Sequence, residues 1–280
     1  MSSSSIAVAG GSGGLGGFIV DALVATGNFQ VKVLTRGAAP AEPKREVEYA
    51  QVNYADHDQL VDALRGVKIV VSALNAFAVG FEQQALIAAA ADAKVERFVP
   101  SEFGLPPQHG KDYGFYAGKI RAQKAIQSAG LEYVLYGVGS FTDYAFYPPF
   151  GFDFDNDAVD APGDGDAPIS WTWREDVGRF VAETVALPES RNVTLGVEGD
   201  VKSVREVAEI VGRKKGVKMT ITHTPLEDLA EAAKTSDNGF VVFASELRTA
   251  FAKGDMRVPS PTKPRTFKPK TVEDWVQQNI

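Results

Sequence analysis

The sequence predicts an α/β fold, in which a doubly wound parallel sheet is followed by a smaller C-terminal α/β lobe. Two observations carry this prediction. Short apolar segments alternate with amphipathic ones through the first half of the chain, which is typical of βαβ units with helices on both faces of the sheet. A turn rich in glycine also follows the first apolar segment, as it commonly does between the first strand and helix of this fold.

The first part of the chain divides into alternating elements. The apolar segments that predict strands are residues 4–10, 29–36, 46–54, 67–74, 95–100 and 131–140. Segments with helical periodicity lie at 18–27, 57–66, 81–94 and 113–125. We expect residues 1–145 to form the sheet domain and residues 146–280 the smaller lobe, with some later elements returning to the sheet domain.

The alternation of predicted strands and helices stops at residue 146. Residues 146–168 are rich in Pro, Gly and Asp and follow no period, so we expect a loop there. Helices are predicted at 174–187, 203–216, 226–234, 244–254 and 271–280, and strands at 192–197 and 218–224. The Asp residues of the loop lack the order of a calcium-binding loop, and the 3 histidines are scattered, so no metal site is expected.

Composition excludes several classes of site and partner. The 280 residues include no cysteine, which rules out disulfides, thiolate nucleophiles and zinc–sulfur sites. The net charge of -7 argues against nucleic acid as a partner, because phosphate binding depends on clustered Lys and Arg. No Lys or Arg precedes Lys32, as one would in a secretory leader, and no apolar run reaches the ~18 residues of a membrane span. We expect a soluble, cytoplasmic protein that is a monomer or a homodimer and binds no membrane.

The glycine turn, "AVAGGSGGLGG", is the most informative stretch. It fits two spacings, because Gly10 or Gly11 can each be combined with Gly13 and Gly16. A strand before the turn and a helix beginning near Gly14 after it are the context that dinucleotide binding requires. Glycines allow close approach of the backbone, and the helix presents free N–H groups to a pyrophosphate. The cofactor contacts expected here are Gly10, Gly11, Ser12, Gly13, Gly14, Leu15 and Gly16. Residues 1–145 are thus predicted to be a Rossmann-type, NAD(P)-binding domain, with an ordinary strand–helix turn as the alternative.

The end of the second predicted strand indicates which dinucleotide is bound. An NAD site would carry Asp or Glu there to hold the ribose hydroxyls, but this chain has Arg36. A guanidinium cannot accept hydrogen bonds from ribose, whereas it pairs well with a 2′-phosphate. Lys44 and Arg45, in the following loop, can add positive charge. The prediction is NADPH/NADP, and a solvated arginine at the end of a strand is the alternative.

Several stretches resemble one known family. They are the glycine turn, Arg36, "VERFVPSEFG" at 95–104, "FYAGKIRAQKAI" at 115–126 and "WTWREDVGRFV" at 171–181. The chain resembles, over nearly its whole length, the NmrA-like and isoflavone reductase-like branch of the atypical short-chain dehydrogenases. This branch includes phenylcoumaran benzylic ether reductases and pinoresinol–lariciresinol reductases, and the P-S-E-F-G string is its most specific feature here.

The resemblance implies a role for Lys119. Phe115 stands four residues before it, where a Tyr-x-x-x-Lys enzyme would carry its tyrosine, but the reductases of this branch keep the lysine without that tyrosine. An ammonium beside a bound cofactor can steady developing negative charge, and with a lowered pKa it can take part in acid–base chemistry. Tyr116 is a weaker candidate for supplying a proton. The alternative for Lys119 is a solvated helix lysine.

The resemblance also implies which strand ends flank the nicotinamide, and ligands of such sheets do bind beyond the carboxyl ends of the strands. The residues concerned are Ser72, Ala73, Ser101, Glu102, Phe103, Ser140 and Phe141. Aromatic side chains nearby in the sequence can line an apolar substrate pocket, namely Phe103, Phe141, Tyr144, Phe146 and Tyr147. The alternative for several of them is core packing.

Two functions remain open from the sequence. The first is an NADPH-dependent reductase, a cytoplasmic oxidoreductase that transfers hydride to an aromatic or conjugated small molecule with the help of Lys119. The second is a non-catalytic NADP(H)-binding redox sensor of the NmrA-like kind. Lys119 and the aromatic residues favour the enzyme, whereas Phe115 in place of tyrosine keeps the sensor open.

Overall fold

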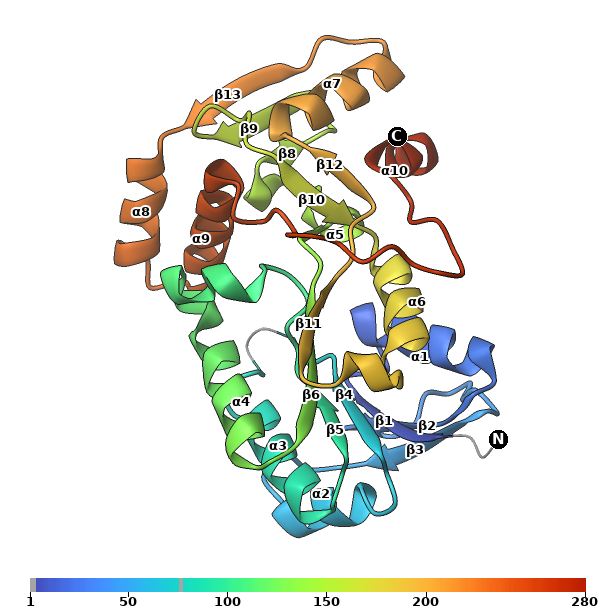
Figure 1. The fold of residues 1–280 in the computed structure, drawn as a ribbon. Helices are drawn as coiled ribbons and strands as arrows, with labels where there is room; N and C mark the ends of the chain where they lie inside the picture. Colours follow the sequence, from blue (N-terminus) through green and yellow to red (C-terminus); the bar gives the residue numbers. More distant parts are fainter. Residues whose placement is uncertain (1–3, 76–77) are drawn as a thin grey trace. The chain divides into compact units, whose positions relative to one another are not determined.

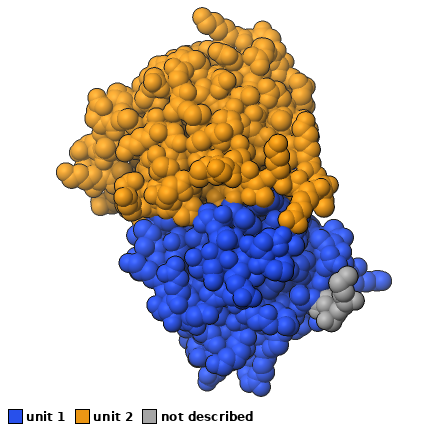
Figure 2. Space-filling model, viewed as in Figure 1, with its two compact units in different colours: residues 1–102, 116–136, 174–195 blue, residues 103–115, 137–173, 196–280 orange. Residues whose placement is uncertain are grey.

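The computed structural model describes residues 4–75 and 78–280, which form two compact units, shown in different colours in Figure 2. Unit 1 comprises the chain up to Glu102 together with Tyr116–Tyr136 and Arg174–Leu195. Unit 2 comprises Phe103–Phe115, Gly137–Trp173 and Gly196–Ile280. We expected a boundary at residue 145, whereas here residues 103–115 and 137–145 belong to unit 2 and residues 174–195 belong to unit 1.

Unit 1 is built on a seven-stranded sheet with the order β11-β6-β5-β4-β1-β2-β3. Its strands are β1 (Ser4–Ala9), β2 (Phe29–Thr35), β3 (Val47–Gln51), β4 (Ile69–Ser72), β5 (Arg97–Val99), β6 (Glu132–Gly137) and β11 (Val193–Gly196). All neighbouring pairs from β3 through β6 are parallel, which confirms the predicted class. The chain order reverses between β1 and β4, and the carboxyl ends of two such strands are where open α/β sheets bind ligands.

Helices cover both faces of this sheet (Figure 1). They are α1 (Gly14–Thr26), α2 (His57–Ala63), α3 (Glu82–Asp92), α4 (Ala117–Ser128) and α6 (Arg174–Thr184). On one face α1 and α6 approach so closely that a Cβ at Gly178 would lie 2.6 Å from main-chain atoms of Phe18. On the other face Leu86 of α3 and Ile126 of α4 pack in one core with Phe98 of β5. The sheet is thus buried on both sides, as its apolar strands predict.

Unit 2 contains two three-stranded sheets, with the orders β12-β10-β7 and β13-β9-β8. Its strands are β7 (Ser140–Phe141), β8 (Phe152–Asp153), β9 (Ala158–Pro162), β10 (Ile169–Thr172), β12 (Asp200–Lys202) and β13 (Thr220–Thr224). Its helices are α5 (Thr142–Ala145), α7 (Val204–Lys215), α8 (Leu226–Thr235), α9 (Gly239–Lys253) and α10 (Val272–Asn279). The loop predicted at 146–168 is wrong in part, because β8 and β9 lie inside it and are held by pairing with each other and with β13.

The strand predicted at 131–140 is in fact two strands. β6 and β7 are separated by Val138 and Gly139, and Gly139 has φ +69°. A Cβ at Gly139 would lie 2.2 Å from the carbonyl oxygen of Ser170, so only glycine fits this turn. β7 then pairs with β10 in unit 2 rather than continuing the large sheet.

Candidate functional site

The glycine turn joins β1 to α1 at the switch point of the sheet. Gly10 has φ +78°, and a Cβ there would lie 2.6 Å from the carbonyl oxygen of Ala73. A Cβ at Gly16 would lie 2.1 Å from the carbonyl oxygen of Gly10. Both positions therefore require glycine, and of the two spacings in the sequence the one that begins at Gly10 is built into the turn.

The outer side of the turn is open. Gly13 is the N-cap of α1 and provides no side-chain hydrogen bond, and the first turn of the helix holds no acidic residue. Ser12, Gly13 and Gly14 are exposed, and a Cβ at Gly13 would meet no atom of the described chain within 4 Å. Free main-chain N–H groups at the positive end of a helix dipole fit the pyrophosphate of a dinucleotide.

Arg174, the first residue of α6, is a neighbour of this turn that the sequence analysis missed. Its Nη1 lies 4.0 Å from the position that a Cβ would take at Gly14. Its guanidinium also lies over the ring of Phe18, 5.9 Å from the ring centroid. A guanidinium here adds positive charge to the site where the helix N–H groups already favour a phosphate. Only the packing of α6 on α1 reveals this proximity, because the two helices are far apart in the sequence.

Two of the basic residues predicted to select NADP, Arg36 and Lys44, differ in their surroundings. Arg36 follows β2 directly and is exposed, and among residues 4–75 and 78–280 no carboxylate forms an ion pair with its guanidinium. Lys44 is paired with Asp21 of α1, so part of its charge is already neutralised. Arg36 is therefore the better placed of the two to bind a 2′-phosphate.

β4 pairs with β1 in the sheet, and β5 pairs with the other side of β4. Ser72 is fully buried, and its Oγ has no hydrogen-bond partner within the described residues, while Ala73 faces the glycine turn. Ser101 is more constrained, since its Oγ donates to the carbonyl of Leu74 at 2.7 Å and its N–H donates to Gln83 at 2.8 Å. The Ser101 hydroxyl thus already has an acceptor within the protein.

Lys119 lies in the first turn of α4 and is half-buried. Its Nζ donates a hydrogen bond to the main-chain carbonyl of Glu102 at 3.1 Å. Burial lowers the pKa of Lys119, and the negative charge of Glu102 opposes this effect. These surroundings differ from those of a solvated helix lysine such as Lys124, which is exposed.

Tyr116 lies in the interior of unit 1. It is fully buried, and its hydroxyl donates to the carboxylate of Glu102, which is also fully buried. Burial, together with the charge of Glu102 and this hydrogen bond, raises the pKa of Tyr116. The phenol is therefore less acidic than a free one, and its hydroxyl already has Glu102 as an acceptor. Direct proton donation by Tyr116 stays a prediction.

The predicted aromatic residues all belong to unit 2, and they differ in exposure. Phe103 is buried, Phe141 is half-buried, and Tyr144 and Tyr147 are each 53% exposed. Ser140, in β7 beside Phe141, is buried. Phe146 packs in an aromatic cluster with Phe152, Phe154, Trp171 and Trp275. For Phe146 these contacts match the core-packing alternative.

Phe115 is also part of the aromatic packing of unit 2. Its ring centroid lies 5.7 Å from that of Tyr113 and 5.4 Å from that of Phe243 in α9. The main-chain N–H groups of Gly114 and Phe115 donate to Glu246 of the same helix, each at 2.8 Å. The phenylalanine at the place of the missing tyrosine is thus a packing residue.

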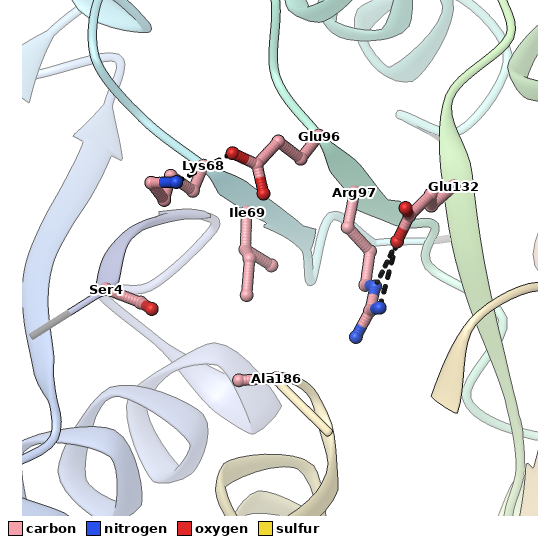
Figure 3. Close-up of a pocket in the computed structure, with 7 residues that line it drawn as sticks. All are labelled: Ser4, Lys68, Ile69, Glu96, Arg97, Glu132 and Ala186. Atoms are coloured by element: carbon pink, nitrogen blue, oxygen red, sulfur yellow. Dashed lines mark hydrogen bonds and ion pairs between the residues drawn. The ribbon is translucent and has the colours of Figure 1, made fainter. Parts of the chain in front are cut away.

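A cavity of about 200 Å³ lies at the amino ends of the strands of the large sheet, away from the glycine turn (Figure 3). Its charged side chains are paired with each other, Lys68 with Glu96 and Arg97 with Glu132. Arg97 also donates to the carbonyls of Val185 and Leu187. These groups link the strands to the chain after α6. They lie at the amino ends of the strands, whereas a dinucleotide binds beyond the carboxyl ends.

Two further classes of site have no support in the described residues. No helix of residues 4–75 and 78–280 has the length and hydropathy needed to cross a membrane. In the same parts of the chain, His, Asp and Glu side chains form no group of three or more that could hold a metal ion.

The model of the NmrA-like family matches residues 2–276 of this chain. Among curated proteins, an oxidoreductase named BOA1 from Botryotinia fuckeliana (strain B05.10) is 30% identical over an alignment of length 259, and the match covers 84% of this chain and 86% of that protein. An isoflavone reductase homolog from Arabidopsis thaliana is 27% identical over 279 residues, covering 91% of this chain and 89% of that protein.

A solved structure has the same fold over almost the whole chain. It is the binary complex of leucoanthocyanidin reductase with NADPH from Vitis vinifera, with a TM-score of 0.82 and 20% identity. The match covers 98% of each chain.

Proposed function

Because the chain belongs to the NmrA-like family, and within it is similar to isoflavone reductase-like proteins, we propose that it is an NADPH-dependent reductase. Its substrate is an aromatic or conjugated small molecule that accepts hydride at an electron-poor carbon. The observation that carries the proposal is the placement of Lys119. This half-buried ammonium hydrogen-bonds the chain just after β5, in the same unit whose sheet carries an open glycine turn.

The residues of unit 1 provide for the two charged parts of the cofactor. The main-chain N–H groups around Gly13, together with Arg174, would hold the pyrophosphate, and Arg36 would hold the 2′-phosphate. When bound, NADPH supplies the hydride.

Lys119 would manage the charge that appears on the substrate when hydride arrives. A lysine ammonium has three N–H donors, and one of them binds the carbonyl of Glu102. The others can donate to a developing oxyanion or carbanion equivalent and stabilise it. Because burial lowers the pKa of Lys119, the side chain can also give up its proton more readily than a solvated lysine.

The aromatic residues of unit 2 suit a planar, apolar substrate. Tyr144 and Tyr147 expose about half of their surface, which is unusual for such large side chains, and Phe141 is half-buried. We assign substrate contacts to these three residues and to Phe103 in preference to Phe146, whose ring already has four aromatic neighbours.

A non-catalytic NADP(H) sensor is the second candidate. The similar proteins named above are an oxidoreductase and an isoflavone reductase homolog, which favours the reductase. The surroundings of Lys119 favour it as well, because a sensor needs no ammonium with a lowered pKa.

The proposal is tested by measuring NADPH binding and NADPH consumption on one preparation. The substrate panel contains isoflavones, aryl enones, benzylic ethers and quinones. Consumption that depends on one substrate class supports the reductase, and its product identifies the carbon that is reduced. Tight NADPH binding with no consumption across the panel favours the sensor.

Arg36→Ala is expected to weaken NADPH binding by about 10- to 100-fold, the value of a lost hydrogen-bonded charge pair, and to leave NADH binding nearly unchanged. The reason is that only NADPH carries the 2′-phosphate. Dissociation constants for both cofactors, measured by fluorescence titration, check this result. Lys44→Ala is the control, because Lys44 is already paired with Asp21. Equal weakening of both cofactors would exclude Arg36 from the 2′-phosphate site.

Arg174→Ala should weaken NADPH and NADH by similar factors, about tenfold each, because the pyrophosphate is common to both. Arg179→Ala is the matched control on the same helix, since Arg179 is ion-paired with Glu175. The two arginine variants are compared by their NADPH/NADH affinity ratio, which should change in Arg36→Ala and stay constant in Arg174→Ala. A changed ratio in Arg174→Ala would contradict the pyrophosphate assignment.

A further inference from the structure

Glu102 is a fully buried carboxylate at the carboxyl end of β5, and both of its side-chain oxygens are hydrogen-bonded. Oε2 accepts from the hydroxyl of Tyr116, and Oε1 accepts from Nε2 of Gln123 at 2.9 Å. The main-chain carbonyl of the same residue accepts from Nζ of Lys119 at 3.1 Å. One residue thus holds three partners, and all three come from the start or the body of α4.

The spacing of these partners explains how one residue reaches them all. Tyr116 is the N-cap of α4, and Lys119 and Gln123 follow three and seven residues later. Positions i, i+3 and i+7 lie on one face of an α-helix, so the three side chains point toward the same neighbour. In the sequence, Lys119 lies between Tyr116 and Gln123, which both donate hydrogen bonds to the carboxylate.

A buried carboxylate is costly unless its oxygens are hydrogen-bonded and its charge is balanced. Tyr116 and Gln123 meet the first condition, and the nearby ammonium of Lys119 meets the second. Fixing the side chain of Glu102 also fixes the peptide carbonyl that receives Lys119. The cluster therefore constrains where the ammonium lies, rather than only adding stability to the fold.

We propose that Glu102 is the positioning residue for Lys119, and that Tyr116 and Gln123 hold Glu102 in the orientation that this requires. The inference rests on the proposed function in one respect, since it makes Lys119 the group that acts on the substrate. It assigns Tyr116 and Glu102 no contact with substrate or cofactor.

Charge is the part of this arrangement that can be measured. Burial lowers the pKa of Lys119, and the charge of Glu102 raises it. A second titratable group beside the ammonium in the described part of the chain is Tyr116, whose ring centroid lies 5.1 Å from Nζ and whose raised pKa keeps it neutral. Removing the charge of Glu102 should thus leave burial unopposed, and the pKa of Lys119 should fall further.

The test is competitive acetylation of the wild-type protein and of Glu102→Gln across a pH series, with each lysine followed by peptide mass spectrometry. Glutamine preserves the shape of the side chain and the main-chain carbonyl, but it removes the charge. The expected result is a shift of the Lys119 titration to lower pH in Glu102→Gln. Lys124, exposed on the same helix, is the internal reference and should not shift. Glu96→Gln is the matched control, because Glu96 is an exposed partner of Lys68.

A second readout uses turnover, and it separates this inference from the proposed function. In Glu102→Gln, the limb of the kcat/KM profile that reports Lys119 should move to lower pH, whether the protonated or the neutral lysine is the active form. A labelling shift without any change in the kcat/KM profile would uphold the positioning by Glu102 and reject the role of Lys119 in turnover. An unshifted Lys119 titration in folded Glu102→Gln would overturn the positioning role, even if the protein is an active reductase.

Thermal unfolding and circular dichroism show whether Glu102→Gln folds. If it does not, Tyr116→Phe is the variant that tests the inference. The phenylalanine ring preserves the buried volume, and the carboxylate loses one of its two donors. A carboxylate held less firmly spends less time near the ammonium, so the Lys119 titration should shift in the same direction as in Glu102→Gln, by a smaller amount. A Tyr116→Phe protein in which Lys119 titrates as in wild type would overturn the inference.

Discussion

Replacing Lys119 by methionine should lower kcat by about 10²-fold or more, the usual value of a group that manages protons or charge in the transition state. NADPH affinity should fall by about tenfold at most, since no more than one hydrogen bond to the cofactor is removed. Methionine has a similar length and no charge, so the side chain can still fill its half-buried place in α4. Steady-state kinetics and a cofactor titration on the same preparation measure both quantities.

Lys124→Met is the matched control for this experiment. It removes an ammonium from the same helix at an exposed position, and it should leave kcat and NADPH affinity unchanged. Lys119→Met with the wild-type kcat would remove Lys119 from the reaction. Loss of NADPH binding in proportion to the loss of turnover would instead make Lys119 a cofactor ligand only.

Gly16→Ala should destabilise the protein by about 3 kcal/mol and abolish high-affinity NADPH binding. The added Cβ would lie 2.1 Å from the carbonyl oxygen of Gly10, so the turn has to open or α1 has to move away from it. The free energy of unfolding from urea titration and the NADPH dissociation constant give the two values.

Gly17→Ala, at the next position along α1, should have the opposite effect on stability. A Cβ there would meet no atom of the described chain within 4 Å, and alanine is favoured over glycine in a helix by about 1 kcal/mol. The pair therefore separates a steric requirement at one glycine from helix propensity in general. If Gly16→Ala were as stable as Gly17→Ala, the close approach of α1 to the turn would be wrong.

The large sheet could be predicted because its signals are local. Each strand from β1 to β6 is a short apolar run, and the helices between them show their own periodicity. The glycine turn was readable for the same reason, since its spacing and its flanking elements lie within 30 residues of each other. The strands β8 and β9 were missed because Asp and Gly obscure the pattern, and their partners lie elsewhere in the sequence.

In the candidate site too, residues within a local motif could be predicted, whereas contacts between segments far apart in the sequence could not. Lys119 was predicted from a resemblance to a family motif, but its hydrogen bond to Glu102 depends on the packing of α4 beside the end of β5. Arg174 carries no motif at all, and only the contact between α1 and α6 brings it to Gly14. The burial of Tyr116 could not be foreseen either, because its position in the sequence gives no sign of it.

The interleaving of the two units along the chain limits how relatives could have exchanged parts during evolution. Residues 174–195, which form α6 and most of β11, belong to unit 1, although residues 137–173 before them belong to unit 2. A crossover in the gene near codon 145 would therefore transfer the glycine turn without the helix that packs on α1. Such a chimera would join α1 of one parent to α6 of the other, where Gly178 meets the backbone at Phe18. New substrate preferences in this architecture are thus expected to arise by point substitutions, rather than by recombination of whole domains.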